Sequence, residues 1–484
     1  MHESTTEAEA RFEEMRRRLG LWLAPLAGGL LWLAPLPLAP QAHTLAAIFA
    51  FTVILWATEA IPMPAAGLIG PVLLVLGGVA PMEKAFSSFA HPVVFLFLGS
   101  FLLALGMQKH GLDRRIANTL LALPAVSKSP LRLLISMSLL TAALSMWMSN
   151  TAITAVMLPI ALGVIRENQA LSGNRSFASA LVLTIAFSAS IGGLATPVGT
   201  PTNLVALGQL ERFGLQKPDF FGWMKLGVPL AVALIVVLII LMRTCGGKVA
   251  AHTAPPSLRT AGKMSRGELN TAFIFLMAIV LWLLPGIADF IGAGKTPLIA
   301  WMKSNVPEEL IGLCAGLLLF VVPVRISAHE FTLDWRDTAK VDWGTLLLFG
   351  GGFALGFQIK ETGLARAIGD GVATLFHQPG EGLLIAVAIA ISILLSEATS
   401  NVASANVMVP LMIGVAQSTG ADPQRVALAT CLACSLGFML PISTPPNALA
   451  YGTGMVRIPE MMKYGLLLDI AGGVAVWVCV RFLV

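Results

Sequence analysis

The chain has 484 residues, of which 56% are hydrophobic and 12% charged, and its mean hydropathy is +0.82. Soluble proteins carry about 25% charged residues, so this composition excludes a soluble multidomain enzyme and a disordered chain. It predicts an all-α polytopic membrane protein, because each helical span needs about 20 apolar residues. The net charge of +5 fits basic cytoplasmic loops, and we expect no nucleic-acid partner.

Apolar runs predict eleven transmembrane spans, preceded by a charged cytoplasmic segment over residues 1–19. The runs lie near residues 20–38, 43–60, 63–80, 91–108, 177–208, 224–242, 269–291, 307–323, 343–358, 422–454 and 463–483. Two further apolar segments, 129–165 and 381–416, carry a polar cluster at their centres. We expect each to form a re-entrant hairpin, because exposed backbone at membrane depth is tolerated only inside protein or beside a water-filled cavity.

The distribution of basic residues predicts the orientation of these spans. With the N-terminus in the cytoplasm, the cytoplasmic segments hold 21 of the 31 Lys and Arg residues, in agreement with the positive-inside rule. Val484 at the C-terminus then lies outside, and the two hairpins enter from opposite sides. Amphipathic stretches at 109–124 and 360–376 precede the hairpins, either as helices in the membrane interface or as ordinary loop helices.

An internal repeat links the two polar segments. Residues 149–159 read SNTAITAVMLP and residues 400–410 read SNVASANVMVP. Each is followed by a long apolar run with a polar interruption, GTPTN at 199–203 and STPPN at 443–447. Inverted repeats with broken helices at matching positions are typical of secondary transporters, and they point to the binding site.

The residue types in these four motifs suit a cation and an anion bound together. Hydroxyl and amide oxygens and the free carbonyls of a broken helix bind sodium, whereas half-helix N-termini attract a carboxylate. None of the motifs contains Lys or Arg, so a bound dianion depends on its co-bound cations, which predicts coupling. One isolated motif would fit helix packing, but two matched pairs favour a binding site.

These motifs resemble those of the divalent anion/sodium symporter family, whose members carry di- and tricarboxylates and in some cases sulfate. The resemblance covers nearly the whole chain and includes WATEAIP (56–62), SMWMSNTAITAVMLP (145–159), SASIGGLATPVGTPTN (188–203), SEATSNVASANVMVP (396–410) and LPISTPPNALAYGTG (440–454). It implies eleven spans, two re-entrant hairpins, a homodimer and an elevator mechanism. By analogy, the scaffold domain comprises residues 20–124 and 243–376, and the transport domain comprises residues 125–242 and 377–484.

The resemblance also assigns binding residues, motif by motif. The first sodium site would use Ser145, Ser149, Asn150 and Gly199, and the second Ser396, Thr399, Asn401 and Ser443. The substrate carboxylates would contact Asn150, Thr151 and Thr200 on one side, and Asn401, Val402, Thr444 and Pro445 on the other. Val402 departs from relatives that have Thr at this place, and its missing hydroxyl leaves the choice of substrate open.

Two acidic residues lie in apolar stretches, where carboxylates are functional candidates by default. Glu397 adjoins the second motif and could tune the cation site or take a proton, whereas Glu59 at a span end fits a structural role. No metalloprotease, phosphate-loop or nucleophile-elbow motif is present, so we expect a transporter and not an enzyme.

The preferred prediction is sodium-coupled symport of dicarboxylates such as succinate, malate or fumarate. Sodium is the expected coupling ion, and no organic cofactor is expected. A sodium-independent exchanger of the same fold stays open, as does a symporter of citrate or sulfate. We expect an integral protein of a bacterial inner membrane, surrounded by lipid.

Overall fold

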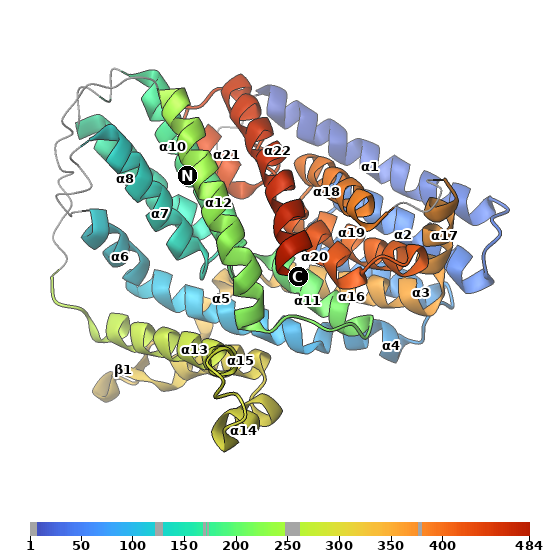
Figure 1. The fold of residues 1–484 in the computed structure, drawn as a ribbon, viewed down its shortest axis with the longest axis horizontal. Coiled ribbons are helices and arrows are strands. Elements are labelled where there is room, and N and C mark those ends of the chain that lie inside the picture. The colour runs from blue at the N-terminus through green and yellow to red at the C-terminus, as the bar shows by residue number, and fades with distance from the viewer. Residues whose placement is uncertain (1–6, 122–128, 168–170, 172–173, 247–261, 376–379) are drawn as a thin grey trace.

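The computed structural model describes residues 7–121, 129–167, 171, 174–246, 262–375 and 380–484, and this part of the chain is almost wholly helical (Figure 1). The helices of the N-terminal half are α1 (Glu7–Leu33), α2 (Pro40–Thr58), α3 (Met63–Leu76), α4 (Met82–Phe86), the 3-10 turn η1 (Ser87–Ala90), α5 (Pro92–His110), α6 (Leu112–Leu121), α7 (Pro130–Ser145), α8 (Asn150–Glu167), α10 (Arg175–Gly193), α11 (Pro201–Arg212) and α12 (Phe220–Gly246).

The C-terminal half repeats much of this order. Its helices are α13 (Arg266–Phe290), α14 (Pro297–Asn305), α15 (Glu308–Val321), α16 (Trp343–Glu361), α17 (Leu364–Leu375), α18 (Glu381–Ala398), α19 (Asn401–Thr419), α20 (Pro423–Cys434), α21 (Pro445–Gly452) and α22 (Ile458–Leu483). Between α15 and α16 lie two short antiparallel strands, β1 (Pro323–Arg325) and β2 (Glu330–Phe331), with the 3-10 turns η2 (Ile326–Ala328) and η3 (Trp335–Lys340).

Within the described residues, eight helices are long and apolar enough to cross a membrane, or nine if the bent pair α14 and α15 forms one span. The chain is therefore an integral membrane protein, while the total of eleven spans stays a prediction. The helices α18 and α19 of the second hairpin belong to the eight. Each arm of that hairpin is therefore as long as a helix that crosses the whole membrane. An arm that enters only halfway would not need this length.

The two expected hairpins have short turns at the repeated motifs. Helix α7 ends at Ser145 and α8 begins at Asn150, while α18 ends at Ala398 and α19 begins at Asn401. The side chain of Ser400 accepts a hydrogen bond from the backbone N–H of Ala403 and so caps α19. A serine at this position supplies an acceptor to a helix N-terminus, which explains where α19 starts.

The two long apolar runs with a polar interruption, 177–208 and 422–454, are broken helices, as the sequence predicts. Helix α10 ends at Gly193 and α11 begins at Pro201, and α20 ends at Cys434 and α21 begins at Pro445. Proline suits the first position of a helix, because its missing N–H would have no partner there. The segments between these helices are the first break, residues 194–200, and the second break, residues 435–444.

The expected boundaries fall at different places relative to the helices. Helix α1 is continuous from Glu7 to Leu33 and so runs through the expected boundary at residues 19/20. The described residues of the charged N-terminal segment and the first expected span therefore form one helix. The expected boundary at 242/243 falls inside α12, and those at 124/125 and 376/377 lie outside the described residues. The expected span 307–323 follows a bend of 80° between α14 and α15, where Pro307 disfavours helical backbone at Val306.

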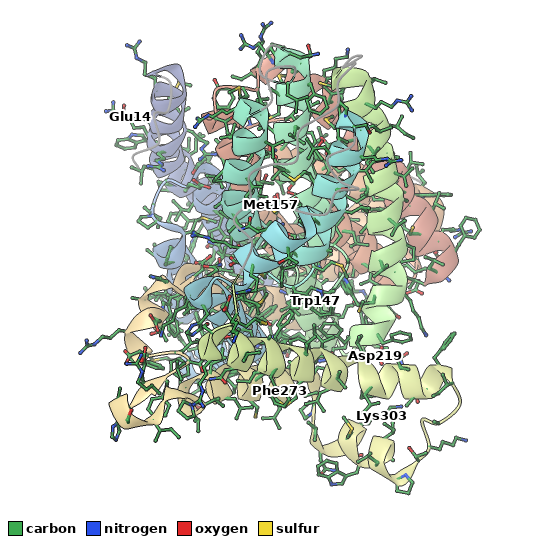
Figure 2. All side chains as sticks on the ribbon, turned by 90° about the vertical axis from the view of Figure 1, so that its left-hand side faces the viewer. Glu14, Trp147, Met157, Asp219, Phe273 and Lys303 are labelled. Atoms are coloured by element: carbon green, nitrogen blue, oxygen red, sulfur yellow. The ribbon has the colours of Figure 1, made fainter. Side chains whose placement is uncertain are left out.

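The amphipathic stretches form short separate helices ahead of each hairpin, α6 and α17. Helix α10 is the most deeply buried candidate span, because 94% of its most apolar stretch lies inside the protein. For α22 the buried share of the most apolar stretch is 28%. Helices α12 and α22 cross the middle of Figure 1, with α7 and α8 on one side and α18 and α19 on the other. In Figure 2, Trp147 at the tip of the first hairpin lies close to α13, and its ring contacts Phe275 of that helix.

Candidate functional site

The tip of the first hairpin is built around a hydrogen bond between Ser145 and Asn150. The buried Ser145 Oγ donates to Asn150 Oδ1 at 2.7 Å. The amide of Asn150 lies directly over Gly193, because an ideal Cβ on Gly193 would be 2.7 Å from Asn150 Oδ1. A glycine is therefore required at this end of α10 for the hairpin tip and the first break to meet.

The first break is held in place by Asn203 of α11. Its Nδ2 donates to the carbonyl oxygens of Gly193 at 2.9 Å and Thr196 at 2.8 Å, and its Oδ1 is buried without a partner among the described residues. The hydroxyl of Thr196 donates to the carbonyl of Met146 in the hairpin turn. Gly199 packs against the same two segments, since a Cβ there would lie 2.6 Å from the carbonyl oxygen of Gly193.

The second hairpin and break repeat this arrangement. Ser396 Oγ lies 2.7 Å from Asn401 Oδ1 and 2.6 Å from the carbonyl oxygen of Cys434. Asn447 Nδ2 donates to the carbonyl oxygens of Gly437 and Leu440, both at 3.0 Å. The same side-chain bonds thus recur in both halves of the chain at matching sequence offsets.

The residues expected at the substrate carboxylates lie at helix N-termini. Thr200 and Thr444 precede α11 and α21 with nearly identical extended backbone, at φ −141° and −143°. Thr444 caps its helix by accepting from the N–H of Asn447 at 3.3 Å, and Pro445 is the first residue of α21. Free N–H groups at such ends favour an anion.

Thr151 and Val402 occupy the second position of α8 and α19 and are half-buried. The amides of Asn150 and Asn401 at the first position are also half-buried. Because Asn150 Oδ1 accepts from Ser145, the Nδ2 of Asn150 points away from that serine as a donor. This orientation suits a carboxylate oxygen of a substrate.

Three of the expected sodium ligands have surroundings that the sequence did not indicate. Ser149 is exposed in the hairpin turn, unlike the buried Ser145. The hydroxyl of Thr399 lies 2.8 Å from Ser404 Oγ. Ser443 Oγ donates to the carboxylate of Glu397, so its lone pairs remain available to a cation.

Glu397 is anchored to the second break. Its carboxylate accepts from the backbone N–H of Met439 at 2.8 Å and of Leu440 at 3.2 Å, besides the hydroxyl of Ser443. Sequence reasoning missed its neighbour Asp469 on α22, together with the bracing role of Asn203 and Asn447. The asparagines were visible as the last letters of the two Thr-Pro motifs, whereas Asp469 has no signal in any motif.

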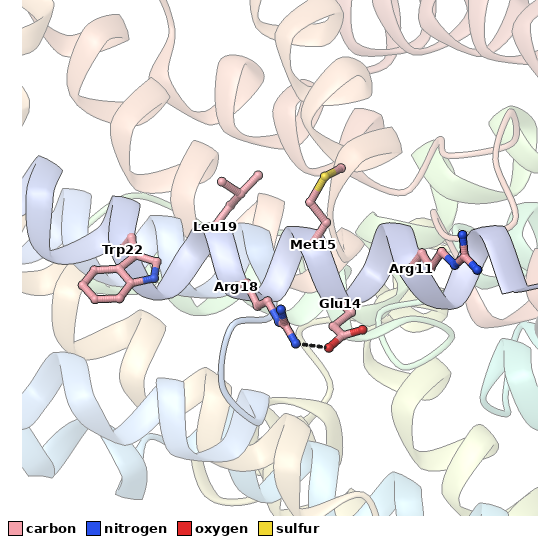
Figure 3. Close-up of a pocket in the computed structure, with 6 residues that line it drawn as sticks. All are labelled: Arg11, Glu14, Met15, Arg18, Leu19 and Trp22. Atoms are coloured by element: carbon pink, nitrogen blue, oxygen red, sulfur yellow. Dashed lines mark hydrogen bonds and ion pairs between the residues drawn. The ribbon is translucent and has the colours of Figure 1, made fainter.

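A shallow surface pocket lies elsewhere, along α1 (Figure 3). Its lining residues all come from this one helix and are Arg11, Glu14, Met15, Arg18, Leu19 and Trp22. The residues of the four motifs take no part in it. The described part of the chain also has no group of three His, Cys, Asp or Glu side chains suited to a metal ion, so any sodium depends on neutral oxygens or on carboxylate pairs.

A fold of broken helices and hairpins with polar tips defines a membrane transporter rather than an enzyme. Two solved transporters share the fold: YdaH from Alcanivorax borkumensis, with a TM-score of 0.57 and 15% identity over 97% of this chain and 98% of that one, and MtrF from Neisseria gonorrhoeae, with a TM-score of 0.56 and 14% identity over 96% and 97%.

Sequence comparisons place the chain more closely. The family model described as citrate transporter matches residues 53–433. The chain is 32% identical to the sodium-dependent dicarboxylate transporter SdcS of Staphylococcus saprophyticus, over 96% of this chain and 91% of that protein. The same identity holds for SdcS of Staphylococcus aureus, over 96% and 90%. The chain therefore belongs to the divalent anion/sodium symporter family of di- and tricarboxylate transporters.

Proposed function

We propose that this protein couples the inward movement of sodium to the uptake of a dicarboxylate such as succinate, malate or fumarate. The observation that carries this proposal is the pair of matched hydrogen bonds, Ser145 to Asn150 and Ser396 to Asn401, each above a glycine at a helix break. The SdcS relatives, which are named sodium-dependent dicarboxylate transporters, support it.

In this proposal, each hairpin tip and its break hold one sodium ion. The first site uses Ser145, Ser149, Asn150 and Gly199, and the second uses Ser396, Thr399, Asn401 and Ser443. Oxygens of serine, asparagine and broken-helix backbone are suitable sodium ligands. Each ion also supplies positive charge beside Asn150 or Asn401, which the motifs themselves lack. A dianion would then bind weakly until both ions are present, and this is the physical basis of coupling.

The substrate would lie between the two halves, with one carboxylate at Asn150, Thr151 and Thr200 and the other at Asn401, Val402, Thr444 and Pro445. Contacts between the halves support such a shared site. Helix α11 packs against α19 and α20, and α21 packs against α8 and α10. Cys431 of α20 also donates from its thiol to the carbonyl oxygen of Thr202 in α11, at 3.2 Å.

Transport would occur by an elevator movement of residues 125–242 and 377–484 against a scaffold of residues 20–124 and 243–376. The helices α6 and α17 would be the connecting arms. The contact between α11 and α16 supports a polar sliding surface, because Gln209 donates to the carbonyl of Gly352 at 3.3 Å and Lys360 to that of Arg212 at 3.1 Å. We also propose a homodimer in a bacterial inner membrane, with the N-terminus in the cytoplasm and the C-terminus outside.

Citrate is the second candidate substrate, because the matching family model is described as citrate transporter. Uptake of labelled succinate into liposomes containing the purified protein tests the proposal. An inward sodium gradient should drive concentrative uptake, and replacing sodium by potassium or choline should abolish it. Uptake that ignores sodium but needs internal dicarboxylate would establish an exchanger and remove the sodium sites. Sodium-driven uptake of citrate alone would keep the coupling and change the substrate.

A further inference from the structure

Asp469 is a buried carboxyl group in the middle of α22 that borders the carboxyl of Glu397 and the backbone of Phe438. Its side chain is 2% exposed, and neither Oδ1 nor Oδ2 makes a hydrogen bond of normal geometry within the described part of the chain. A buried charge without a partner is strongly disfavoured, so such groups are paired, bind a cation or take up a proton. An acidic residue inside a membrane helix is a functional candidate for the same reason.

The carboxyl of Asp469 faces that of Glu397 and the backbone of Phe438 at the second break. Helix α22 comes this close because Gly465, one turn earlier, packs on the same segment. An ideal Cβ at Gly465 would lie 2.3 Å from the carbonyl oxygen of Phe438. Glu397 already accepts from Ser443 and from two backbone N–H groups. These three donors are hydrogen-bonded to Glu397, and none of them bonds to Asp469.

Basic side chains of the neighbouring helices in the described part of the chain are engaged elsewhere. Helix α22 packs against α12, α18 and α20. On α12, Arg243 is exposed and Lys225 lies over the rings of Phe221 and Phe290. At the far end of α22, Arg481 and Arg425 of α20 both pair with Glu381 of α18. Glu397 is the charged group that acts on Asp469.

The described residues of the first half have no such pair at the matching positions. At the offset that relates the hairpins, Met146 stands in the place of Glu397. Gly227 of α12 makes the matching approach to the first break, where its Cβ would lie 2.5 Å from the carbonyl oxygen of Leu194. Four residues beyond Gly227 is Ala231, whereas four beyond Gly465 is Asp469. The carboxyl pair is thus an addition to the second half.

We propose that Glu397 and Asp469 form a further sodium site, next to the second of the two sites in the proposed function. The proposal deepens that function and rests on it. A sodium ion between the two carboxyls removes their repulsion and takes several oxygen ligands at once. Other buried oxygens without partners lie on the adjoining segments, namely Ser392 Oγ, Ser435 Oγ and Asn447 Oδ1.

Equilibrium binding of radiolabelled sodium to the purified full-length protein tests this site. Wild type should bind about one sodium ion per chain more than Asp469→Asn, which keeps the shape of the side chain but removes its charge. Asp469→Ala is the second variant, because alanine occupies the matching place in the first half. Glu460→Gln is the matched control, since it makes the same change on α22 at a residue that bonds to Ser179.

Equal sodium binding by wild type, Asp469→Asn and Glu460→Gln would overturn the proposal. If the sodium affinity then also depends on pH in wild type but not in Asp469→Asn, the pair holds a proton instead of sodium. If wild type binds no succinate in sodium, the proposed transport function fails, and the sodium count still decides whether this site exists.

Discussion

Ser396 Oγ lies 2.7 Å from Asn401 Oδ1, and Ser145 makes the same contact with Asn150 over the same spacing of five residues. Each bond joins the end of one hairpin helix to the start of the next. In the first half the bond fixes which end of the Asn150 amide faces the serine and leaves Nδ2 as a donor, whereas Ser396 Oγ also lies 2.6 Å from the carbonyl oxygen of Cys434. The two halves of the chain thus place an asparagine amide at the same position of each hairpin tip.

Alanine at Gly193 and at Gly437 should have different effects, although the two glycines hold matching places. A Cβ at Gly193 would lie 2.7 Å from Asn150 Oδ1, whereas the nearest atom at Gly437 is Ser443 Cβ at 3.3 Å. Gly193→Ala must displace the asparagine, so we expect sodium-driven succinate uptake to fall at least about tenfold, the equivalent of about 1.4 kcal/mol. Gly437→Ala should retain most of the uptake. Equal losses in the two variants would contradict this difference.

Asn203→Ala should destabilise the protein, because it leaves the buried carbonyls of Gly193 and Thr196 without their donor. A buried unsatisfied polar group costs about 1–3 kcal/mol. Thermal unfolding of the purified protein measures the loss. Asn305→Ala is the control, because Asn305 also donates to a carbonyl, that of Trp301, but at an exposed site. A melting temperature for Asn203→Ala no lower than that of Asn305→Ala would rule out the bracing role.

Lys217 bridges the two proposed domains, with Nζ 2.8 Å from carboxylate oxygens of both Glu211 and Glu309. Because the bridge stabilises the observed state by about 1 kcal/mol at most, Lys217→Met should speed exchange of labelled for unlabelled succinate by up to about fivefold. Lys303→Met removes an ion pair with Asp289 inside the scaffold and should leave the exchange rate unchanged. A slower rate in Lys217→Met would contradict the proposed role of the bridge.

The effect of Lys217→Met should not depend on pH between mildly acidic and mildly alkaline conditions. Burial disfavours the charged form of Lys217, but its hydrogen bonds to Glu211 and Glu309 outweigh burial and raise its pKa. A group with a raised pKa contributes fully below its ordinary pKa, and the contribution is lost only as the pH rises through the raised value. Exchange rates of wild type and variant that converge near neutral pH would show that the bridge titrates earlier.

Val402→Thr should change the preference among dicarboxylates more than the yield of folded protein. Threonine has nearly the shape of valine and adds one hydroxyl at the second position of α19, where a substrate carboxylate is expected. One added hydrogen bond is worth about 1 kcal/mol, or a change of about fivefold in relative affinity. Competition of unlabelled succinate, malate, fumarate and citrate against labelled succinate measures it. If the four acids compete in the same order and with the same relative affinities in the variant as in wild type, Val402 does not contact the substrate.

Local patterns in the sequence predicted the hairpin turns and both helix breaks, because proline, glycine and capping serine act on the backbone near them. Contacts between distant segments were not predictable in this way. Asp469 meets Glu397 only because Gly465 lets α22 approach the second break. The bend of 80° before α15 was not predicted, because residues 303–309 (KSNVPEE) are polar and the expected span begins only at residue 307.

The most direct test of the central claim is equilibrium binding of succinate to the purified protein in sodium and in choline. We predict binding in sodium and none in choline. Ser145→Ala and Ser396→Ala should each raise the sodium concentration needed for succinate binding by about tenfold, since each loses a hydrogen bond worth about 1.5 kcal/mol. Equal binding of succinate in sodium and in choline would contradict the account, because the two serine–asparagine pairs would then hold no coupling ion.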